Sequence, residues 1–284
     1  MNSYWRRKFA WSNSRHSQWQ ECKKQYYFNY IAKWDGLPGD PGRDKLYQLS
    51  DLQRLVFLKG SLLHEVIKQQ INNQRVDRPV SAEAAKSFFI SELERANSNQ
   101  EKCITEAFNG FPIAEEEFKN IEIDGIKQID NFCNIIWNNY KNVMYIDHEK
   151  NDMFSVDNIN LRVKCDFLAK NNETFVVTDW KTGSEGFDDI NESIQMSAYI
   201  LWVHSKYKAP LDKIIGEVVY LKSCNSEIVK KSEKELKEFK EFILRSSQEM
   251  LEVNSEKDFP ASPNRNCKGC NFATICEDGK KFLN

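Results

Sequence analysis

The sequence lacks an excess of charge of either sign. Its 40 Lys and Arg residues nearly balance its 42 Asp and Glu residues, which leaves a formal net charge of -2 over 284 residues. Such a chain has no overall positive charge that would indicate nucleic-acid binding. Any contact with DNA must therefore come from local basic patches.

Long apolar runs are also missing. Residues 1–13 include Arg6, Arg7 and Lys8 but no apolar stretch of signal-peptide length, and no later stretch approaches a membrane span. We therefore expect a cytoplasmic protein with no membrane partner. The sequence has no internal repeat, low-complexity tract or Gly/Ser linker, and its 40% apolar residues are sufficient for a globular core. We expect a single domain over residues 1–284.

The spacing of apolar residues predicts a mixed α/β core. Helical spacing is found over residues 14–32, 52–71, 82–96, 126–145, 190–207 and 232–253. Short β-prone runs predict strands over residues 153–156, 161–169, 174–180 and 214–221. We divide the chain into an N-terminal helix (1–35), a helical elaboration (65–145), an α/β core (146–225) and a Cys-rich tail (255–284).

Two acidic residues and a lysine are expected to meet on one face of the sheet. In the run Thr174 to Lys181, a period of two places Asp179 and Lys181 on the same face. A tight turn at Asn171-Asn172 would pair Asp166 with Val177, and this pairing would place Asp166 diagonal to Asp179. Two converging carboxylates suit Mg²⁺ or Mn²⁺, which can bind a phosphate oxygen and acidify a water molecule.

Further polar residues show helical spacing around this pair. Gln195 and Tyr199 are four residues apart, as are Gly60 and His64, and an imidazole can act as an additional metal ligand. Each feature also has an ordinary structural explanation. An Asp-Trp-Lys-Thr sequence is more often solvated surface, and a single helical histidine usually has a structural role.

The order of these motifs along the chain is similar to that of a known enzyme family. Gly60-x-x-x-His64, Asp166, Asp179-Trp180-Lys181-Thr182-Gly183 and Gln195-x-x-x-Tyr199 resemble the motif series of the RecB-like branch of PD-(D/E)XK nucleases. The resemblance implies a restriction-endonuclease-like core, with a mixed central sheet flanked by helices, a helical insertion and cluster-binding termini. It also implies that His64, Asp166, Asp179 and the backbone carbonyl of Trp180 surround the metal and that Lys181 is the catalytic lysine. Glu149 would be an accessory acidic residue.

Three of the eight cysteines are clustered in the C-terminal part of the sequence. Cys267, Cys270 and Cys276 form a C-x2-C-x5-C motif, a spacing that allows three thiols to bind one soft metal centre. Because thiols in the cytosol stay reduced, a metal site is favoured over disulfides. Cys22 lies in the N-terminal helix, and its use as a fourth ligand requires the two ends of the chain to meet.

This arrangement resembles the iron-sulfur subset of RecB-like nucleases, which includes AddB-type nuclease domains and CRISPR-associated nucleases. The resemblance implies a [4Fe-4S] cluster on Cys22, Cys267, Cys270 and Cys276. Four thiolates also bind zinc, and sequence spacing does not distinguish the two centres. A third interpretation is free thiols in a flexible tail. The remaining cysteines, Cys103, Cys133, Cys165 and Cys224, are isolated and have no expected ligand role.

The resemblance implies a DNA nuclease that processes DNA ends in repair, recombination or phage defence, alone or with a helicase or CRISPR partner protein. The basic and aromatic residues near the N-terminus, Trp5 to Lys8, Arg15, Lys23 and Lys24, are candidates for contact with single-stranded ends. Two alternatives remain: a catalytically silent, DNA-binding scaffold subunit, and a zinc-stabilised interaction protein. The intact set of Asp166, Asp179 and Lys181 favours the enzyme.

Overall fold

The computed structural model describes residues 9–34, 37, 39–75, 78, 80–140, 144–147, 151–185, 189–253 and 255–283. The chain divides into two compact units. The first contains Met1–Leu58, Arg95–Glu115 and Ile243–Asn284, and the second contains Lys59–Glu94 and Glu116–Phe242. Whether they form one folding domain over residues 1–284 is not tested by this division and stays a prediction.

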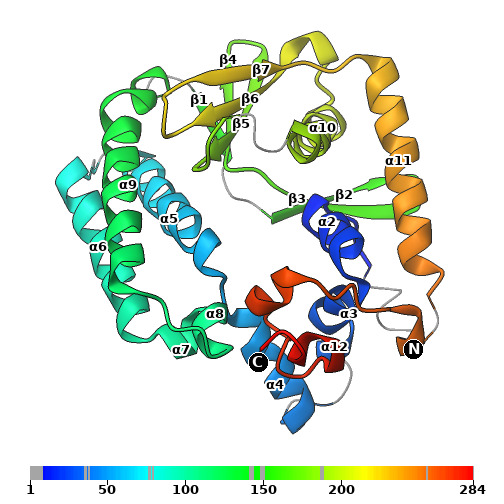
Figure 1. The fold of residues 1–284 in the computed structure, drawn as a ribbon. Helices are drawn as coiled ribbons and strands as arrows, with labels where there is room; N and C mark the ends of the chain where they lie inside the picture. Colours follow the sequence, from blue (N-terminus) through cyan, green and yellow to red (C-terminus); the bar gives the residue numbers. More distant parts are fainter. Residues whose placement is uncertain are drawn as a thin grey trace. The chain divides into compact units, whose positions relative to one another are not determined.

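The second unit contains a mixed five-stranded sheet with the order β1-β4-β5-β6-β7 (Figure 1). Only the pairing of β5 with β6 is parallel, and helix α10 connects these two strands. A separate antiparallel hairpin is formed by β2 and β3. The strands are β1 (Met144–Asp147), β2 (Asn151–Val156), β3 (Ile159–Lys164), β4 (Phe167–Asn171), β5 (Thr174–Lys181), β6 (Ile214–Tyr220) and β7 (Ser226–Val229).

Helices flank the sheet, as the predicted α/β class requires. The longer ones are α5 (Leu55–Arg75), α6 (Ala82–Ser98), α9 (Glu115–Asn134), α10 (Asp189–Tyr207) and α11 (Glu233–Leu251). A core of buried side chains joins α5 and α9 to one face of the sheet, and its members include Ile67, Ile71, Phe132, Phe167, Trp180 and Val219. Trp180 is 1% exposed and makes edge-on contacts with Phe132 and Tyr140. Because side chains alternate along β5, Asp179 and Lys181 point to the opposite face.

The first unit contains several short helices, the C-terminal part of α11 and the C-terminal segment. Its short helices are α2 (Asn13–Glu21), α3 (Lys23–Tyr30), α4 (Pro41–Asp51), α7 (Gln100–Cys103), α8 (Thr105–Phe108) and α12 (Glu277–Lys280). Five 3-10 turns complete the described chain: η1 (Ala32–Trp34), η2 (Ile136–Asn139), η3 (Leu211–Lys213), η4 (Glu256–Asp258) and η5 (Arg265–Gly269). Among the residues that the structure describes, no helix has both the length and the apolar character needed to cross a membrane.

Several boundaries differ from the sequence prediction. The helix expected over 14–32 is interrupted at Cys22, whose backbone is extended (φ -158, ψ 108). The helix expected over 126–145 ends at Asn134, and the strand expected over 161–169 is broken between Lys164 and Phe167. Helix α4 and strands β1 and β7 were missed. β7 is short and mostly exposed, so it lacks the apolar alternation that identifies a strand in sequence.

Candidate functional site

The two predicted acidic residues lie where β4 begins and β5 ends, within the second unit. The observed register pairs Phe167 with Thr178 and Leu168 with Val177, so the predicted pairing of Asp166 with Val177 is wrong. The turn lies one residue later than expected, because Asn172 takes the left-handed conformation (φ 54) that a tight hairpin requires. Extending this register places Asp166 directly opposite Asp179, so the two residues still share a face.

Asp179 is held by the lysine and the glutamine that were predicted to accompany it. Its Oδ2 lies 3.0 Å from Lys181 Nζ, and its Oδ1 accepts a hydrogen bond of 2.8 Å from Gln195 Nε2. Lys181 Nζ also donates to Gln195 Oε1 at 3.1 Å. Gln195 on α10 thus connects the carboxylate and the ammonium group and restrains both side chains.

Asp166 is held from two other directions. Its Oδ1 lies 3.3 Å from His64 Nδ1 on α5, and its Oδ2 accepts a 2.9 Å hydrogen bond from the backbone N–H of Trp180. The Trp180 indole is buried in the core, so only the backbone of this residue is near the carboxylates. A role for Trp180 as a ligand through its carbonyl oxygen stays a prediction.

Tyr199 completes this hydrogen-bond network from one turn further along α10. Its hydroxyl donates to the backbone carbonyl of Lys164 at 2.7 Å and accepts from Gln195 Nε2 at 2.7 Å. Burial raises the pKa of Tyr199 well above its usual value, and the charge of Asp179 adds to the increase. The phenol therefore stays protonated and acts as a hydrogen-bond donor.

The electrostatic balance around Asp179 favours binding of a cation. Asp179 is 4% exposed. Burial, together with the charge of Asp166, raises the pKa of its carboxyl group to about 6, although Lys181 opposes this shift. A buried carboxylate with a second carboxylate beside it is incompletely compensated, and a divalent cation would supply the missing positive charge.

Gly60 allows helix α5 to approach the end of strand β5. A Cβ atom at this position would lie 3.1 Å from Thr182 Oγ1, which is closer than nearly all such contacts. His64 follows one helical turn later and faces Asp166. The close approach at Gly60 therefore explains why a glycine precedes the histidine by four residues.

The sequence analysis missed a group of residues that supports this strand end. Gln128 on α9 is fully buried, and its Nε2 donates to the backbone carbonyl of Thr182 at 3.2 Å and to Asp124 Oδ2 at 3.1 Å. Asp124 also forms an ion pair with Lys59, the residue before Gly60. Asp124 and Gln128 are four residues apart, a spacing that indicates one face of a helix. Nothing in the sequence, however, indicated that this face would contact Thr182.

The donor set fits a hard divalent cation, although the side chains do not surround one point as they stand. No group of three or more His, Cys, Asp or Glu residues in the described part of the chain is arranged to hold a metal ion. Each carboxylate oxygen of Asp166 and Asp179 instead faces an internal donor: His64, Trp180, Gln195 or Lys181. Two carboxylates and an imidazole are suitable ligands for Mg²⁺ or Mn²⁺ after small side-chain rotations.

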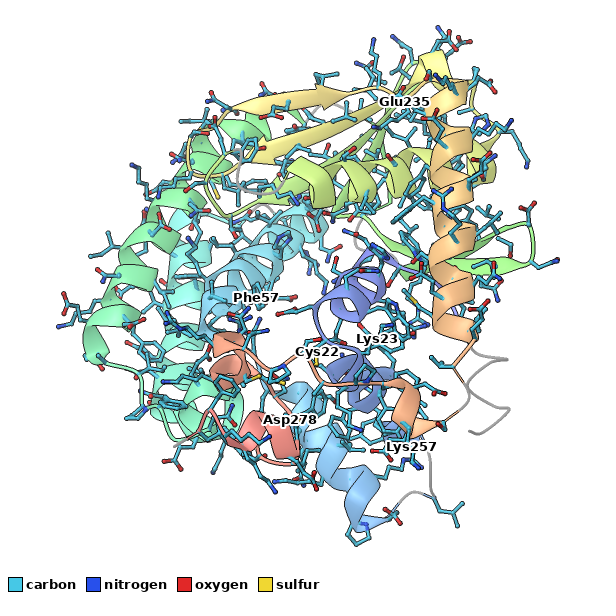
Figure 2. All side chains as sticks on the ribbon, turned by 45° about the vertical axis from the view of Figure 1, so that its right-hand side comes forward. Cys22, Lys23, Phe57, Glu235, Lys257 and Asp278 are labelled. Carbon is cyan, nitrogen blue, oxygen red and sulfur yellow. The ribbon has the colours of Figure 1, made fainter. Side chains whose placement is uncertain are left out.

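The structure brings the four predicted cluster cysteines together in the first unit. Cys22, Cys267, Cys270 and Cys276 all line one cavity, whose other walls include Phe28, Pro263, Phe272 and Ala273. Cys22 is located at the junction of α2 and α3, beside the C-terminal segment (Figure 2). The two distant parts of the sequence therefore meet, as their use in one site requires.

The surroundings of these thiols suit a buried metal centre. Backbone N–H groups of Asn264 and Gly279 donate to the sulfur atoms of Cys267 and Cys276 at 3.5 and 3.4 Å. Burial raises the pKa of Cys270 to about 12, and the three neighbouring thiols add to the increase. Amide donors and an apolar shell are features that tune iron-sulfur sites. The four thiols fit such a group chemically.

The loop that carries Cys267 and Cys270 is held by α8. Asn109 is 6% exposed, and its Nδ2 donates to the carbonyl oxygens of Lys268 and Cys270 at 2.9 and 3.0 Å. Thr105 donates to Asn271, the residue after Cys270, at 2.8 Å. These bonds give the loop a defined conformation, so it is not a flexible tail.

The predicted N-terminal DNA contacts divide into several groups. Trp11, Trp19 and Tyr26, the aromatic residues close to these candidates in sequence, are buried and belong to the core. The Arg15 guanidinium lies 4.7 Å from the Tyr30 ring centre, and Lys23 Nζ lies 4.5 Å from that of Trp19. Lys24 pairs with Glu256 at 2.9 Å. Trp5 to Lys8 and Glu149 lie outside the described residues.

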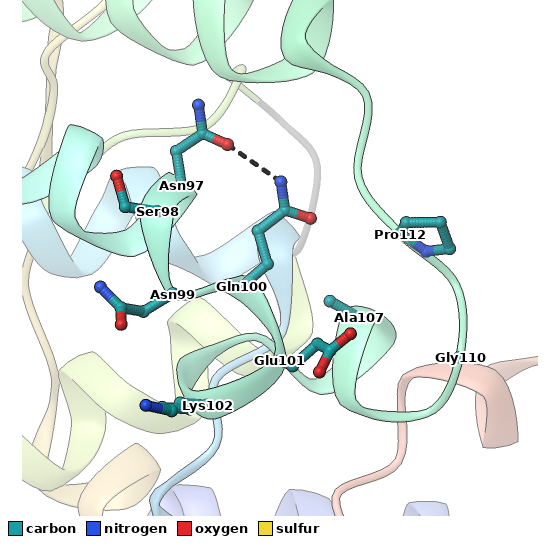
Figure 3. Close-up of a pocket in the computed structure, with 9 residues that line it drawn as sticks. All are labelled: Asn97, Ser98, Asn99, Gln100, Glu101, Lys102, Ala107, Gly110 and Pro112. Carbon is teal, nitrogen blue, oxygen red and sulfur yellow. Dashed lines mark hydrogen bonds between the residues drawn. The ribbon is translucent and has the colours of Figure 1, made fainter.

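Another pocket of the first unit contains none of the predicted site residues. It is lined mainly by the segment from Asn97 to Lys102, together with Ala107, Gly110 and Pro112 (Figure 3). Gln100 Nε2 donates to Asn97 Oδ1 at 2.9 Å, and Gln100 Oε1 accepts from the Ile113 N–H at 2.9 Å. The amide of Gln100 is thus engaged in holding the loop.

Comparisons with known proteins agree with this geometry. A model of the PD-(D/E)XK nuclease superfamily matches residues 10–277. No curated protein matches the chain significantly. The matched range covers most of the chain, including Asp166, Asp179, Lys181 and all four clustered cysteines, so the chain belongs to the PD-(D/E)XK nuclease superfamily.

Proposed function

We propose that this nuclease is a metal-dependent deoxyribonuclease that processes DNA ends. The observation that carries the proposal is the pair formed by buried Asp179 and partly buried Asp166, with Lys181 beside Asp179. In this reading His64, Asp166, Asp179 and the Trp180 carbonyl hold Mg²⁺ or Mn²⁺. When bound, the cation supplies charge stabilisation at the scissile phosphate and acidifies a water molecule.

Within this site each side chain has a separate task. Lys181 holds its ammonium group next to Asp179, where it can orient the attacking water and neutralise charge on the phosphate. Gln195 and Tyr199 limit the movement of Asp179 and Lys181 through the hydrogen bonds described above. Such restraint lowers the cost of reaching a reactive geometry.

We further propose a [4Fe-4S] cluster on Cys22, Cys267, Cys270 and Cys276. The four thiols line one cavity with apolar walls, and backbone N–H groups donate to two of the sulfur atoms. An apolar shell and amide donors to sulfur are features of iron-sulfur sites. The cluster would then stabilise the fold and would take no part in hydrolysis.

A second candidate is a partner-dependent subunit that binds DNA but does not cut it alone. The observation favouring it is that all four oxygens of Asp166 and Asp179 already have internal partners. A helicase or CRISPR-type partner protein that delivers single-stranded ends would then be needed for activity, in a cytoplasmic repair or defence pathway. The helical elaboration over residues 65–145 is a candidate binding region for such a partner.

The first experiment compares the wild type with Lys181→Ala on end-labelled single- and double-stranded DNA. Protein purified without oxygen would be incubated with Mg²⁺, Mn²⁺ or EDTA. Cleavage that needs a metal ion and is lost in Lys181→Ala supports the deoxyribonuclease, and the label shows which end is cut first. Absence of cleavage with every metal ion supports the partner-dependent subunit instead.

A further inference from the structure

The β2–β3 hairpin has two chemically different faces. Its inner face is apolar and includes Leu161 (0% exposed) and Val163 (3% exposed). This face is also anchored to α10, because the Asp152 carboxylate pairs with Lys206 and accepts a 3.3 Å hydrogen bond from Trp202 Nε1. The hairpin is therefore held firmly enough to present a defined outer surface.

The outer face is exposed and carries positive charge only. We call this set the hairpin face: Met153, Ser155, Asn160, Arg162 and Lys164. The register pairs Met153 with Arg162 and Ser155 with Asn160, so the five side chains form one surface. The acidic residues of Asn151–Lys164 lie elsewhere, since Asp152 faces inward and Asp157 lies in the turn.

The two cations of the hairpin face have no partner within the described part of the chain. No hydrogen bond or ion pair joins the Arg162 or Lys164 side chain to another described residue, whereas Lys59, Lys181 and Lys206 each pair with a carboxylate. Exposed lysines and arginines are ordinary on protein surfaces. Here, however, the hairpin face has no carboxylate. In addition, Met153, which is 56% exposed, lies beside the cations.

The hairpin face leads directly to the candidate active site. Lys164 and Arg162 precede Asp166 by two and four residues, so their Cα atoms lie within about 7 and 14 Å of that of Asp166. The backbone carbonyl of Lys164 is also bonded to Tyr199, which belongs to the active-site network. A polyanionic strand whose scissile phosphate lies at Asp166 therefore has a cationic surface within a few nucleotides.

We propose that the hairpin face binds the phosphodiester backbone of a single DNA strand on one side of the scissile phosphate. Arg162 and Lys164 contact phosphate oxygens, and Met153 packs against sugars or bases. This inference rests on the proposed function, and it adds the substrate-binding surface that the overall charge of -2 does not reveal.

The test measures binding separately from cleavage. Fluorescence anisotropy of a labelled oligodeoxythymidylate in EDTA would compare the wild type, Arg162→Gln/Lys164→Gln and the control Lys234→Gln/Lys237→Gln, which removes two exposed cations of α11. The first double variant should bind about tenfold more weakly, and its slope of log Kd against log salt should fall by about 1.4, since each phosphate contact contributes about 0.7. The control should match the wild type.

Equal Kd values and salt slopes for the wild type and Arg162→Gln/Lys164→Gln would overturn the inference. In each single variant the salt slope should fall by about half as much as in the double variant. Circular dichroism would establish that both exposed positions tolerate glutamine. In Mg²⁺ the double variant should show a raised KM with a nearly unchanged kcat. If the wild type binds DNA through the hairpin face but never cleaves it, only the proposed function is contradicted. If the wild type cleaves DNA but the double variant has the same salt slope as the wild type, only this inference is contradicted.

Discussion

Single residues of the candidate active site have little freedom, because each donor and acceptor serves a neighbour. Gln195 contacts Asp179, Lys181 and Tyr199 at once. A substitution here removes a chemical group and also releases the groups that it held. Chemical and positional effects can still be separated by choosing substitutions of nearly the same shape.

Asp179→Asn should abolish cleavage, with a loss of at least about 100-fold in kcat/KM, because asparagine cannot supply the carboxylate charge that the metal ion needs. The protein should remain folded, since the amide has the size of the carboxyl group. Initial rates on end-labelled DNA and a thermal melt measure the two effects. Asp212→Asn, at an exposed position of η3, is the matched control. Substantial cleavage by Asp179→Asn would contradict the site assignment.

Tyr199→Phe tests positioning without removal of charge. Loss of the hydroxyl removes the 2.7 Å donor to the partly buried Lys164 carbonyl, and such a hydrogen bond contributes about 0.5–1.5 kcal/mol to stability. We expect kcat to fall about tenfold, with little change in KM, because Asp179 and Lys181 become less restrained. Urea unfolding and steady-state kinetics measure these effects. Tyr207→Phe, on the same helix, should leave kcat unchanged.

Among the helices and strands, α5 and β5 determine where the ligands meet. Gly60→Ala would place a methyl group 3.1 Å from Thr182 Oγ1, so either Thr182 or helix α5, with His64 on it, must shift by a few tenths of an ångström. We expect cleavage to fall about tenfold while stability changes little, because alanine favours the helix by about 1 kcal/mol. Thr182→Ala removes the opposing atom, so Gly60→Ala/Thr182→Ala should regain most of the rate. No recovery would mean that Gly60 serves another purpose.

The sequence predicted strand β5 and helix α10 better than it predicted the turn that precedes β5. Alternation along β5 correctly placed Asp179 and Lys181 on one face, and helical spacing correctly placed Gln195 beside Tyr199. The turn before β5 was displaced by one residue, because Asn171, Asn172 and Glu173 all tolerate turns and only backbone geometry selects among them. The role of Gln128 was not predictable, because its hydrogen bond to the Thr182 carbonyl depends on the folded structure and not on sequence spacing.

For the whole molecule, the strongest organising feature is the cavity shared by Cys22 and the C-terminal cysteines. A centre bound there closes a loop of more than 240 residues, and closing so long a loop restricts the unfolded chain strongly. Loss of a ligand should therefore weaken the fold before it changes the chemistry.

A bound [4Fe-4S] cluster should give the purified protein a brown colour. Cys270→Ser should lose this colour and most of the bound iron, and its thermal midpoint should fall by several degrees. Cys103→Ser is the control, because Cys103 does not line the cavity. Iron content, visible absorbance and calorimetry of protein purified without oxygen provide the measurements. Stoichiometric zinc without iron in the wild type would replace the iron-sulfur proposal with a zinc site.

The meeting of Cys22 with Cys276 also orders events during synthesis. Cys22 leaves the ribosome more than 240 residues before Cys276, so the set is complete only after Cys276 has emerged. His64, Asp166, Asp179 and Lys181 are all translated before that point. A product that ends between Lys181 and Cys267 would therefore contain the proposed hydrolytic residues without three of the proposed cluster ligands. Without the stabilising centre it would be exposed to proteolysis, so cells would retain mainly the product that extends beyond Cys276.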